Sequence, residues 1–216
     1  MVSVPNHYYK TDKSANVAIC VPVRDTVTAV FAHSLAMLMK KCGETGLATT
    51  LHFNMGSEVA MQRQQLVDQA LETSCTHIMW IDSDMKFPVD TLNILLGHKK
   101  DIVAGNYSTR VPPYRPVAFA SEGNLDQRIF SGTGLQEAFA VGSGMMLVHR
   151  RVYENMSKPY YKIEYSEDFS SLVGEDIFFC NKAKEHGYSV FVDHAISDKI
   201  AHIGTRAFTV KEDCNE

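Results

Sequence analysis

Two aspartates separated by one residue follow a short apolar segment in the middle of the chain. The segment 77–81 reads HIMWI, and Asp82, Ser83 and Asp84 come directly after it. An apolar run of this length is typical of a buried strand, and in extended chain residues two apart point to the same side. Both carboxylates can therefore converge just past the strand, where they repel each other unless a cation lies between them. A solvated turn is the alternative, but the strand in front and a helix opening at Pro88 favour a metal site.

A second acidic pair and a late histidine could take part in the same chemistry. Glu175 and Asp176 follow Gly174 at the start of an expected helix. A carboxylate there could accept a proton from an incoming hydroxyl, although acids are favoured in a first helical turn in any case. His202 would favour a transition metal if the tail folds back to the metal at Asp82, and is otherwise a hydrogen-bonded tail histidine.

Arginines and glycines supply candidate ligand contacts. Arg63 lies on the side of an expected helix that should pack, and its planar fork suits a phosphate. Arg24 and Asp25 follow the first strand, where a nucleotide lies in a doubly wound sheet. The glycines of the 142–144 segment, GSG, allow close backbone approach to a ligand. The alternatives are a solvated helix face for Arg63, a turn with a helix cap for Arg24 and Asp25, and a tight turn for the glycines.

Length and composition predict one domain over residues 1–216, with peripheral tails at 1–15 and 207–216. The chain has 216 residues, of which 45% are hydrophobic, and a net charge of −4. It offers no basic surface for nucleic acid and no apolar run that could span a bilayer. Its five cysteines are scattered, which predicts reduced thiols and a cytoplasmic location, in a host cell if the protein is viral. The oligomeric state is not predicted.

Strand and helix patterns alternate in the first half and predict an α/β fold with a mostly parallel sheet. Expected strands are 17–23, 49–54, 77–81 and 101–104. Expected helices are one capped by Asp25 or Thr26 and ended by Gly43, one capped by Ser57, and one over 88–98. The second half predicts a surface loop over 106–116, short mixed strands at 117–120, 137–141 and 145–149, and a helix at 150–156. Then come a mobile flap over 158–172, a helix from Glu175 to before Gly187, a strand at 188–192, and an irregular tail.

Two nucleotide-binding motifs are absent from the sequence. There is no G-x-x-x-x-G-K-[ST] and no G-x-G-x-x-G. Phosphate loops of the nucleoside triphosphatase type and the dinucleotide fingerprint are therefore excluded.

Five segments together resemble glycosyltransferases of the GT-A fold, close to the family-2 type. They are THIMWIDSDMKFP at 76–88, VAGNYSTR at 103–110, VGSGMMLVHR at 141–150, GEDIFF at 174–179 and HIG at 202–204. The resemblance covers about residues 17–204. It extends to small glycosyltransferases of phages and large DNA viruses, including those that build chlorella-virus capsid glycans.

The resemblance implies a GT-A fold, with a mostly parallel central sheet flanked by helices plus a small mixed β part. It also implies transfer of a sugar from a nucleotide-diphosphate sugar, most often a UDP-sugar, to a hydroxyl of a glycan or glycoprotein acceptor. Mn²⁺ would be the cofactor, with Mg²⁺ second, and the metal ligands would be Asp82, Asp84 and His202. Asp176 would be the catalytic base, with Glu175 beside it. The nucleotide-sugar would contact Pro22, Arg24, Asp25, Gly56, Ser57, Arg63, Asp82, Ser83, Tyr107, Arg110, Gly142, Ser143 and Gly144.

One segment departs from the family pattern, and two other functions remain open. Where the family often carries an acidic pair on the second strand, this chain has HFNM at 52–55, which leaves recognition of the base in doubt. The alternatives are a metal-dependent nucleotidyltransferase or phosphohydrolase, which also uses paired aspartates, and a non-catalytic module that binds sugar nucleotides.

Overall fold

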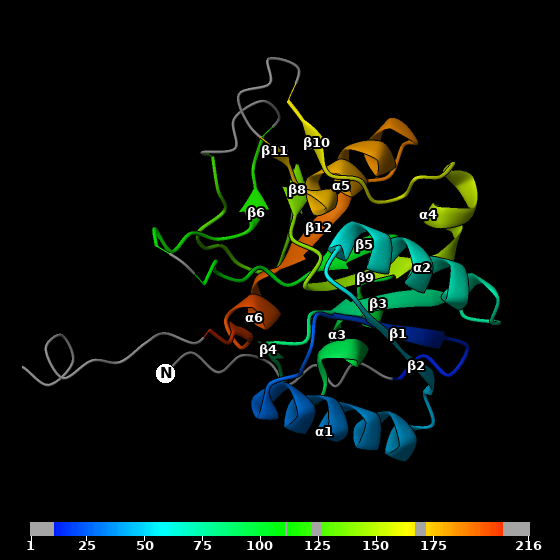
Figure 1. Ribbon diagram of the computed structural model, residues 1–216. Coiled ribbons are helices and arrows are strands. Elements are labelled where there is room, and N and C mark those ends of the chain that lie inside the picture. The colour runs from blue at the N-terminus through cyan, green and yellow to red at the C-terminus, as the bar shows by residue number, and fades with distance from the viewer. Residues whose placement is uncertain (1–10, 111, 122–126, 167–171, 205–216) are drawn as a thin grey trace, which may run out of the picture.

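A seven-stranded sheet forms the centre of the computed structural model, which describes residues 11–110, 112–121, 127–166 and 172–204 (Figure 1). From one edge to the other its strands are β2 (Ala48–Met55), β1 (Asn16–Val23), β3 (His77–Ile81), β9 (Met145–His149), β5 (Ile102–Ala104), β12 (Val190–Asp193) and β7 (Leu135–Ala138). Pairing shows that five strands share one direction, while β9 and β7 run opposite to their neighbours. The expected mostly parallel sheet is confirmed, with the 145–149 strand inserted at its centre.

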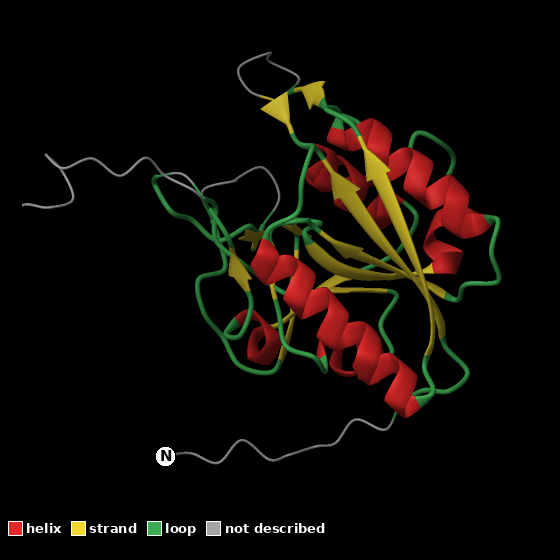
Figure 2. Ribbon diagram, turned by 60° about the horizontal axis from the view of Figure 1, so that its bottom comes forward, coloured by secondary structure: helices red, strands yellow, loops and turns green. Residues whose placement is uncertain are grey.

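Helices cover both faces of the sheet, and the sheet divides the core in two (Figure 2). The helices are α1 (Ala29–Thr45), α2 (Val59–Leu71), α3 (Thr91–Gly97), α4 (Arg150–Asn155), α5 (Glu175–Glu185) and α6 (His194–Ser197). β1 shows the division, since Ala18 and Cys20 face the core under α2, α4 and α5, while Val17, Ile19 and Val21 face that under α1, α3 and α6. This period of two places every residue of a buried strand in one core or the other.

The first two helices begin later than their sequence signals predict. Thr28 caps α1, its Oγ1 accepting the Phe31 amide at 3.1 Å, and Gly46 ends the helix at φ +74°. Asp25 and Thr26 therefore precede the cap, and Gly43 lies inside the helix instead of ending it. At α2 the residue before the helix is Glu58, with no side-chain cap, so the expected cap by Ser57 is wrong.

Pairing near the third helix brings the chain's late residues back to the sheet. α3 starts at Thr91, directly after Asp90. Residues 85–86 form β4 (Met85–Lys86), which pairs antiparallel with β13 (Ala201–His202). The expected start at Pro88 is wrong, and the expected irregular tail contains α6 and β13. Met85 lies opposite His202 in this pairing, so His202 reaches the end of β3.

In the segment expected to be a mobile flap, two tyrosines of the described part 158–166 pack against the core. Tyr160 and Tyr161 are only 6% and 3% exposed. The Tyr160 amide donates to Oε1 of Gln64 on α2 at 2.9 Å. The prediction missed this packing because aromatic residues without a clear period give no sequence signal for burial. Four short strands complete the structure: β6 (Ala118–Phe119), β8 (Ala140–Val141), β10 (Glu164–Tyr165) and β11 (Leu172–Val173).

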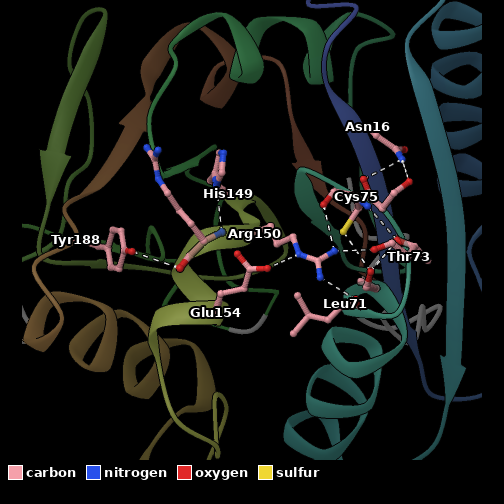
Figure 3. Close-up of polar contacts among 11 residues, drawn as sticks. Asn16, Leu71, Thr73, Cys75, His149, Arg150, Glu154 and Tyr188 are labelled. Atoms are coloured by element: carbon pink, nitrogen blue, oxygen red, sulfur yellow. Dashed lines mark hydrogen bonds and ion pairs between the residues drawn. The ribbon is translucent and has the colours of Figure 1, made fainter.

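Arg150 fastens the start of α4 to the end of α2 (Figure 3). Its guanidinium donates to the carbonyls of Leu71 at 2.9 Å and Thr73 at 2.6 Å, and to Oε1 of Glu154 at 2.7 Å. Carbonyls at a helix C-terminus lack intrahelical partners, and a cation there is favourable. The contact holds the turn from His149 into α4 in place.

No helix in the described part of the chain is both long and apolar enough to cross a membrane. The expected tails, 1–15 and 207–216, lie mostly outside the described residues.

Candidate active site

A cleft of about 480 Å³ opens at the carboxyl ends of β1 and β3. Ten of the residues predicted for the site line it: Pro22, Arg24, Asp25, Gly56, Ser57, Asp82, Ser83, Asp84, Arg110 and His202. They come from segments spread over most of the chain, and they meet because parallel strands end at one edge of the sheet.

The two aspartates after β3 do not point to one place. The Met85 amide donates to the Asp82 carbonyl at 3.1 Å, so residues 82–85 form a turn. The expectation that Asp82 and Asp84 point to the same side assumed an extended backbone, and it is therefore wrong. Asp82 Oδ1 accepts from Nη2 of Arg63 at 2.8 Å, whereas Asp84 Oδ1 lies 3.2 Å from Nε2 of His202.

Asp84 is held between two basic side chains at the mouth of the cleft. Its second oxygen pairs with Nη1 of Arg110, whose side chain is half exposed. Burial opposes ionisation, but the hydrogen bond and charge of His202 and the charge of Arg110 outweigh it and lower the pKa of Asp84. Asp84 is therefore an anion at neutral pH.

The Asp84–His202 pair has the chemistry of two ligands of one divalent cation. Nδ1 of His202 lies 3.0 Å from the Ser108 carbonyl, which can only accept, so this nitrogen carries a proton. In a neutral imidazole Nε2 would then carry a lone pair that a cation beside Asp84 could take, and a carbonyl that accepts from the other ring nitrogen is usual behind a metal-bound histidine. Within the described ranges no three His, Cys, Asp or Glu side chains gather where they could hold a metal ion together. The residues fit such an ion.

Arg63 is the buried centre of a polar cluster beside the cleft. Its side chain is 2% exposed and donates to Asp82 and, from Nε at 3.3 Å, to Oε1 of Glu175. The guanidinium also lies over the rings of Trp80 and Tyr161, at 5.2 and 6.0 Å. Arg63 thus joins the β3 acid to the α5 acid and does not line the cleft, which revises the expectation that it reaches the ribose or diphosphate.

An aromatic chain that sequence reasoning missed encloses this arginine. Trp80 Nε1 donates to the Tyr153 hydroxyl at 2.8 Å, and the Tyr153 and Tyr161 hydroxyls are 2.8 Å apart. Burial raises the pKa of both tyrosines, so they remain neutral. The only sequence signal was a Trp in the strand before the aspartates.

Asp176 lies in the first turn of α5, next to the Glu175 that binds Arg63. Burial, and secondarily the charge of Glu175, raise the pKa of Asp176 to about 6. Its Oδ1 accepts the Ile177 amide at 2.8 Å, which fixes the carboxyl group. Such a pKa suits a group that takes up a proton near neutral pH.

The glycines of the 142–144 segment make room for Tyr107. The Gly144 amide donates to the Tyr107 hydroxyl at 2.9 Å. A Cβ on Gly144 would lie 2.5 Å from that hydroxyl oxygen and 2.7 Å from Asp82 Oδ2. Tyr107 in turn packs edge to face on His202, with ring centroids 5.2 Å apart. The segment therefore shapes the cluster behind the cleft, and Ser143 is 1% exposed there.

Comparison of the whole structure with solved structures decides the fold. The viral protein A197 from STIV has a TM-score of 0.56 at 13% identity, covering 91% of this chain and 98% of that one. A mutant of Drosophila β-1,4-galactosyltransferase 7, in a complex with manganese, UDP-Gal and xylobiose, has a TM-score of 0.50 at 16% identity, covering 94% of this chain and 80% of that one. The chain has the GT-A fold.

Sequence comparison adds nothing to this result. No protein-family model matches the chain, and no curated protein matches it significantly. A glycosyltransferase involved in glycosylation of the major capsid of PBCV-1 is also similar, at 14% identity over 89% of this chain and 94% of that one, but with a TM-score of 0.41.

Five further residues line the cleft of this GT-A domain and were not predicted. They are Thr26, Thr28, Val59, Gln62 and Ile203. Thr28 could have been found, because the cap of a helix that follows a parallel strand lies at the ligand edge of the sheet. Gln62 could not, since its Nε2 donates to the carbonyls of Val23 at 2.7 Å and Asn54 at 2.6 Å, partners that only the fold supplies.

We expect Gly144→Ala to disrupt this site and Gly43→Ala to leave it intact. The new methyl group must displace Tyr107 or Asp82, and overpacking of this kind costs about 1–3 kcal/mol. Around Gly43, inside α1, nothing lies within 4 Å, so alanine should stabilise the helix by about 0.5–1 kcal/mol. Urea denaturation of both variants measures these changes. A Gly144→Ala protein as stable as the parent would mean that Tyr107 is not fixed by this glycine.

Proposed function

We propose that this chain is a metal-dependent glycosyltransferase that moves a sugar from a nucleotide-diphosphate sugar, with a UDP-sugar as preferred donor, to a hydroxyl of a glycan or glycoprotein. The observation that carries the proposal is the Asp84–His202 pair, backed by the Ser108 carbonyl, at the mouth of a 480 Å³ cleft. The GT-A fold and a similar structure crystallised with manganese and UDP-Gal support it.

In this proposal Asp84 and His202 hold the cation, and an imidazole ligand favours Mn²⁺ over Mg²⁺. A bound ion would neutralise charge on the leaving diphosphate. Arg110 already lies against Asp84 and is half exposed, so it is placed to meet the same phosphates. A second anion at this point is favourable because it shares the two cationic groups that otherwise both contact the carboxylate of Asp84.

Arg63 holds Asp82 for contact with the ribose or the donor sugar. Because Arg63 takes only Oδ1 of Asp82, the second oxygen is left beside Gly144 for a hydroxyl donor. Arg24, Asp25 and Gln62 line the part of the cleft nearest β1 and β2 and would contact the nucleoside. Arg24 and Asp25 pair with each other at 3.4 Å and are largely exposed, so both can turn toward a base.

Asp176 would take the proton from the acceptor hydroxyl, with inversion at the transferred carbon. Its carboxyl is held by the Ile177 amide, and the Arg63–Glu175 pair fixes the first turn of α5 against Asp82. The acceptor would therefore approach from the α5 side of the cluster, while the donor lies in the cleft.

Product analysis tests this function against its two competitors. We expect the protein with Mn²⁺, a UDP-sugar panel and glycan acceptors to release UDP at a rate that rises with acceptor. Asp84→Ala should abolish the Mn²⁺-dependent release and the Mn²⁺-dependent thermal stabilisation by UDP, because His202 alone cannot hold the ion. A variant at Lys40, an exposed residue on α1 paired with Glu44, serves as the charge control.

Other products would assign another function. Release of UMP instead of UDP would identify a nucleotidyltransferase or phosphohydrolase. Stabilisation by UDP-sugars without any release, at every metal concentration, would identify a binding module. Unchanged Mn²⁺-dependent UDP binding in Asp84→Ala would remove the metal from this site.

A further inference from the structure

A second cleft, of about 260 Å³, lies at the other end of β3. The first cleft, at the carboxyl ends of β1 and β3, begins after the last residue of β3. The second cleft is lined by Thr76 and His77, where β3 starts. Its other walls come from the turn after α3 and the junction of β9 with α4, including Lys99, Lys100, His149 and Arg151. The proposed transfer reaction uses none of these residues.

Positive side chains from two separate segments face this cleft. Lys99 and Lys100 follow α3, and Arg151 is the second residue of α4. The Lys100 ammonium lies over the Phe191 ring, 4.2 Å from its centroid. Two carboxylates oppose them: Asp101, which pairs with Arg151, and Asp12, whose Oδ1 accepts from the amide and hydroxyl of Ser14. Three cations against two anions leave one excess positive charge here, in a chain whose net charge is −4.

Two histidines meet in this cleft and offer ring nitrogens to a ligand. His149 Nδ1 accepts the Arg151 amide at 3.1 Å, so in a neutral ring Nε2 carries the proton. His77 Nδ1 lies 2.8 Å from the Thr76 hydroxyl, which can donate to it or to the Asn16 carbonyl at 3.1 Å, so either ring nitrogen of His77 can carry the proton. The rings meet edge to face at 4.7 Å.

Arg150 makes this arrangement rigid without taking part in it. Its guanidinium donates to the carbonyls at the end of α2 and to Glu154 (Figure 3). The residues on either side of it, His149 and Arg151, are those that line the cleft.

Lys99 occupies a backbone conformation that disfavours a lysine. Its φ is +52°, and among the described residues it is the only non-glycine with positive φ. It lies just after the last turn of α3, where its amide donates to the Leu96 carbonyl at 3.0 Å and where helices commonly have glycine. A strained residue whose side chain lines a cleft points to a use for that side chain.

We propose that this cleft is a second ligand site, which binds a phosphate group, free or carried on a small molecule. Lys99, Lys100, Arg151 and the His149 Nε2–H would donate to the phosphate oxygens, and His77 Nε2 would donate to a phosphate oxygen or accept from a phosphate hydroxyl, according to its tautomer. The inference does not depend on the reaction proposed for the first cleft.

The test is a titration of the full-length protein with inorganic phosphate and, separately, with glycerol 3-phosphate, at constant ionic strength set by NaCl. The imidazole signals of His77 and His149 are followed by NMR, with Mg²⁺ in place of Mn²⁺ and with UDP present to fill the first cleft. We expect saturable shifts of both signals. Equal affinities would assign the site to free phosphate, and tighter binding of the ester would assign it to a phosphorylated small molecule.

Lys99→Gly should weaken this binding and stabilise the fold at the same time. Loss of one exposed cationic contact weakens binding about fivefold, while glycine at positive φ should raise Tm by about 2–4 °C. Lys99→Arg, which keeps charge and backbone, should bind like the parent. Lys40→Met, on the distant α1, should also bind like the parent.

Three results would overturn the proposal. The histidine signals could fail to saturate, or NaCl alone could reproduce their shifts. Lys99→Gly could also gain stability while binding phosphate as tightly as the parent, which would make Lys99 only the residue that ends α3.

Discussion

Asp176→Asn should lose turnover by about 10²–10⁴-fold, the usual contribution of a general base, while donor affinity stays within a few-fold. Asparagine keeps the size of the side chain and an oxygen that can accept the Ile177 amide. It removes only the proton acceptor. Steady-state release of UDP, with donor affinity measured separately by calorimetry, gives the two quantities.

The same variant should be more stable than the parent at neutral pH. The pKa of Asp176 is about 6 in the folded chain against an ordinary value of 3.8. Between these values the unfolded chain binds fewer protons than the folded one, so the contribution of Asp176 to stability falls as pH rises from about 4 to 6 and stays low above that. Asparagine cannot ionise and escapes this cost. Thermal melts at pH 4 and pH 7 should therefore show the gain only at pH 7.

Activity of the parent should follow the same ionisation. Turnover should fall about tenfold for each pH unit below the pKa, because the protonated carboxyl cannot accept a proton. Glu185→Gln, at the exposed end of the same helix, is the matched control and should change neither rate nor pH profile. Near-normal turnover in Asp176→Asn would leave Asp176 as a helix-terminus residue. A collapse of donor binding with it would place the carboxylate on the donor and favour a retaining mechanism.

Arg63→Met should destabilise the protein by about 3–5 kcal/mol, because it leaves two inward-facing carboxylates without their cation. The guanidinium is 2% exposed and pairs with both Asp82 and Glu175. The stability of Arg63→Lys should lie between that of the parent and that of Arg63→Met. An ammonium group keeps the charge but cannot span both carboxylates or lie flat over Trp80. Urea denaturation measures each difference.

Two further variants separate the buried pair from an ordinary ion pair. Lys158 bonds Asp68 at 2.6 Å on the surface, so Lys158→Met should lower the free energy of unfolding far less than Arg63→Met does. Adding Asp82→Asn and Glu175→Gln to Arg63→Met should restore part of the stability by removing the unpaired charges. If Arg63→Met costs no more than Lys158→Met, the cluster does not hold the acids together as proposed.

The sequence by itself determined that the sheet is mostly parallel and at which of its edges the cleft lies. Apolar strands such as residues 17–23 and 77–81, with helical periodicity between them, require helices on both faces of a parallel sheet. Polar residues directly after those strands, including Arg24 and Asp82, must then share the carboxyl edge, and the cleft contains them. Local chemistry sufficed because each of these signals lies within a few residues of a strand end.

Only the tertiary structure decided what those side chains contact. Asp82 and Asp84 look equivalent in the sequence, but a turn sends one to Arg63 and the other to His202. His202 reaches Asp84 through the pairing of β13 with β4, a contact across more than a hundred residues that no local pattern encodes. The burial of Arg63 depends on Trp80 and Tyr161, from strands and segments far apart in sequence. The second cleft likewise exists because β9 runs antiparallel beside β3, which places His149 against His77.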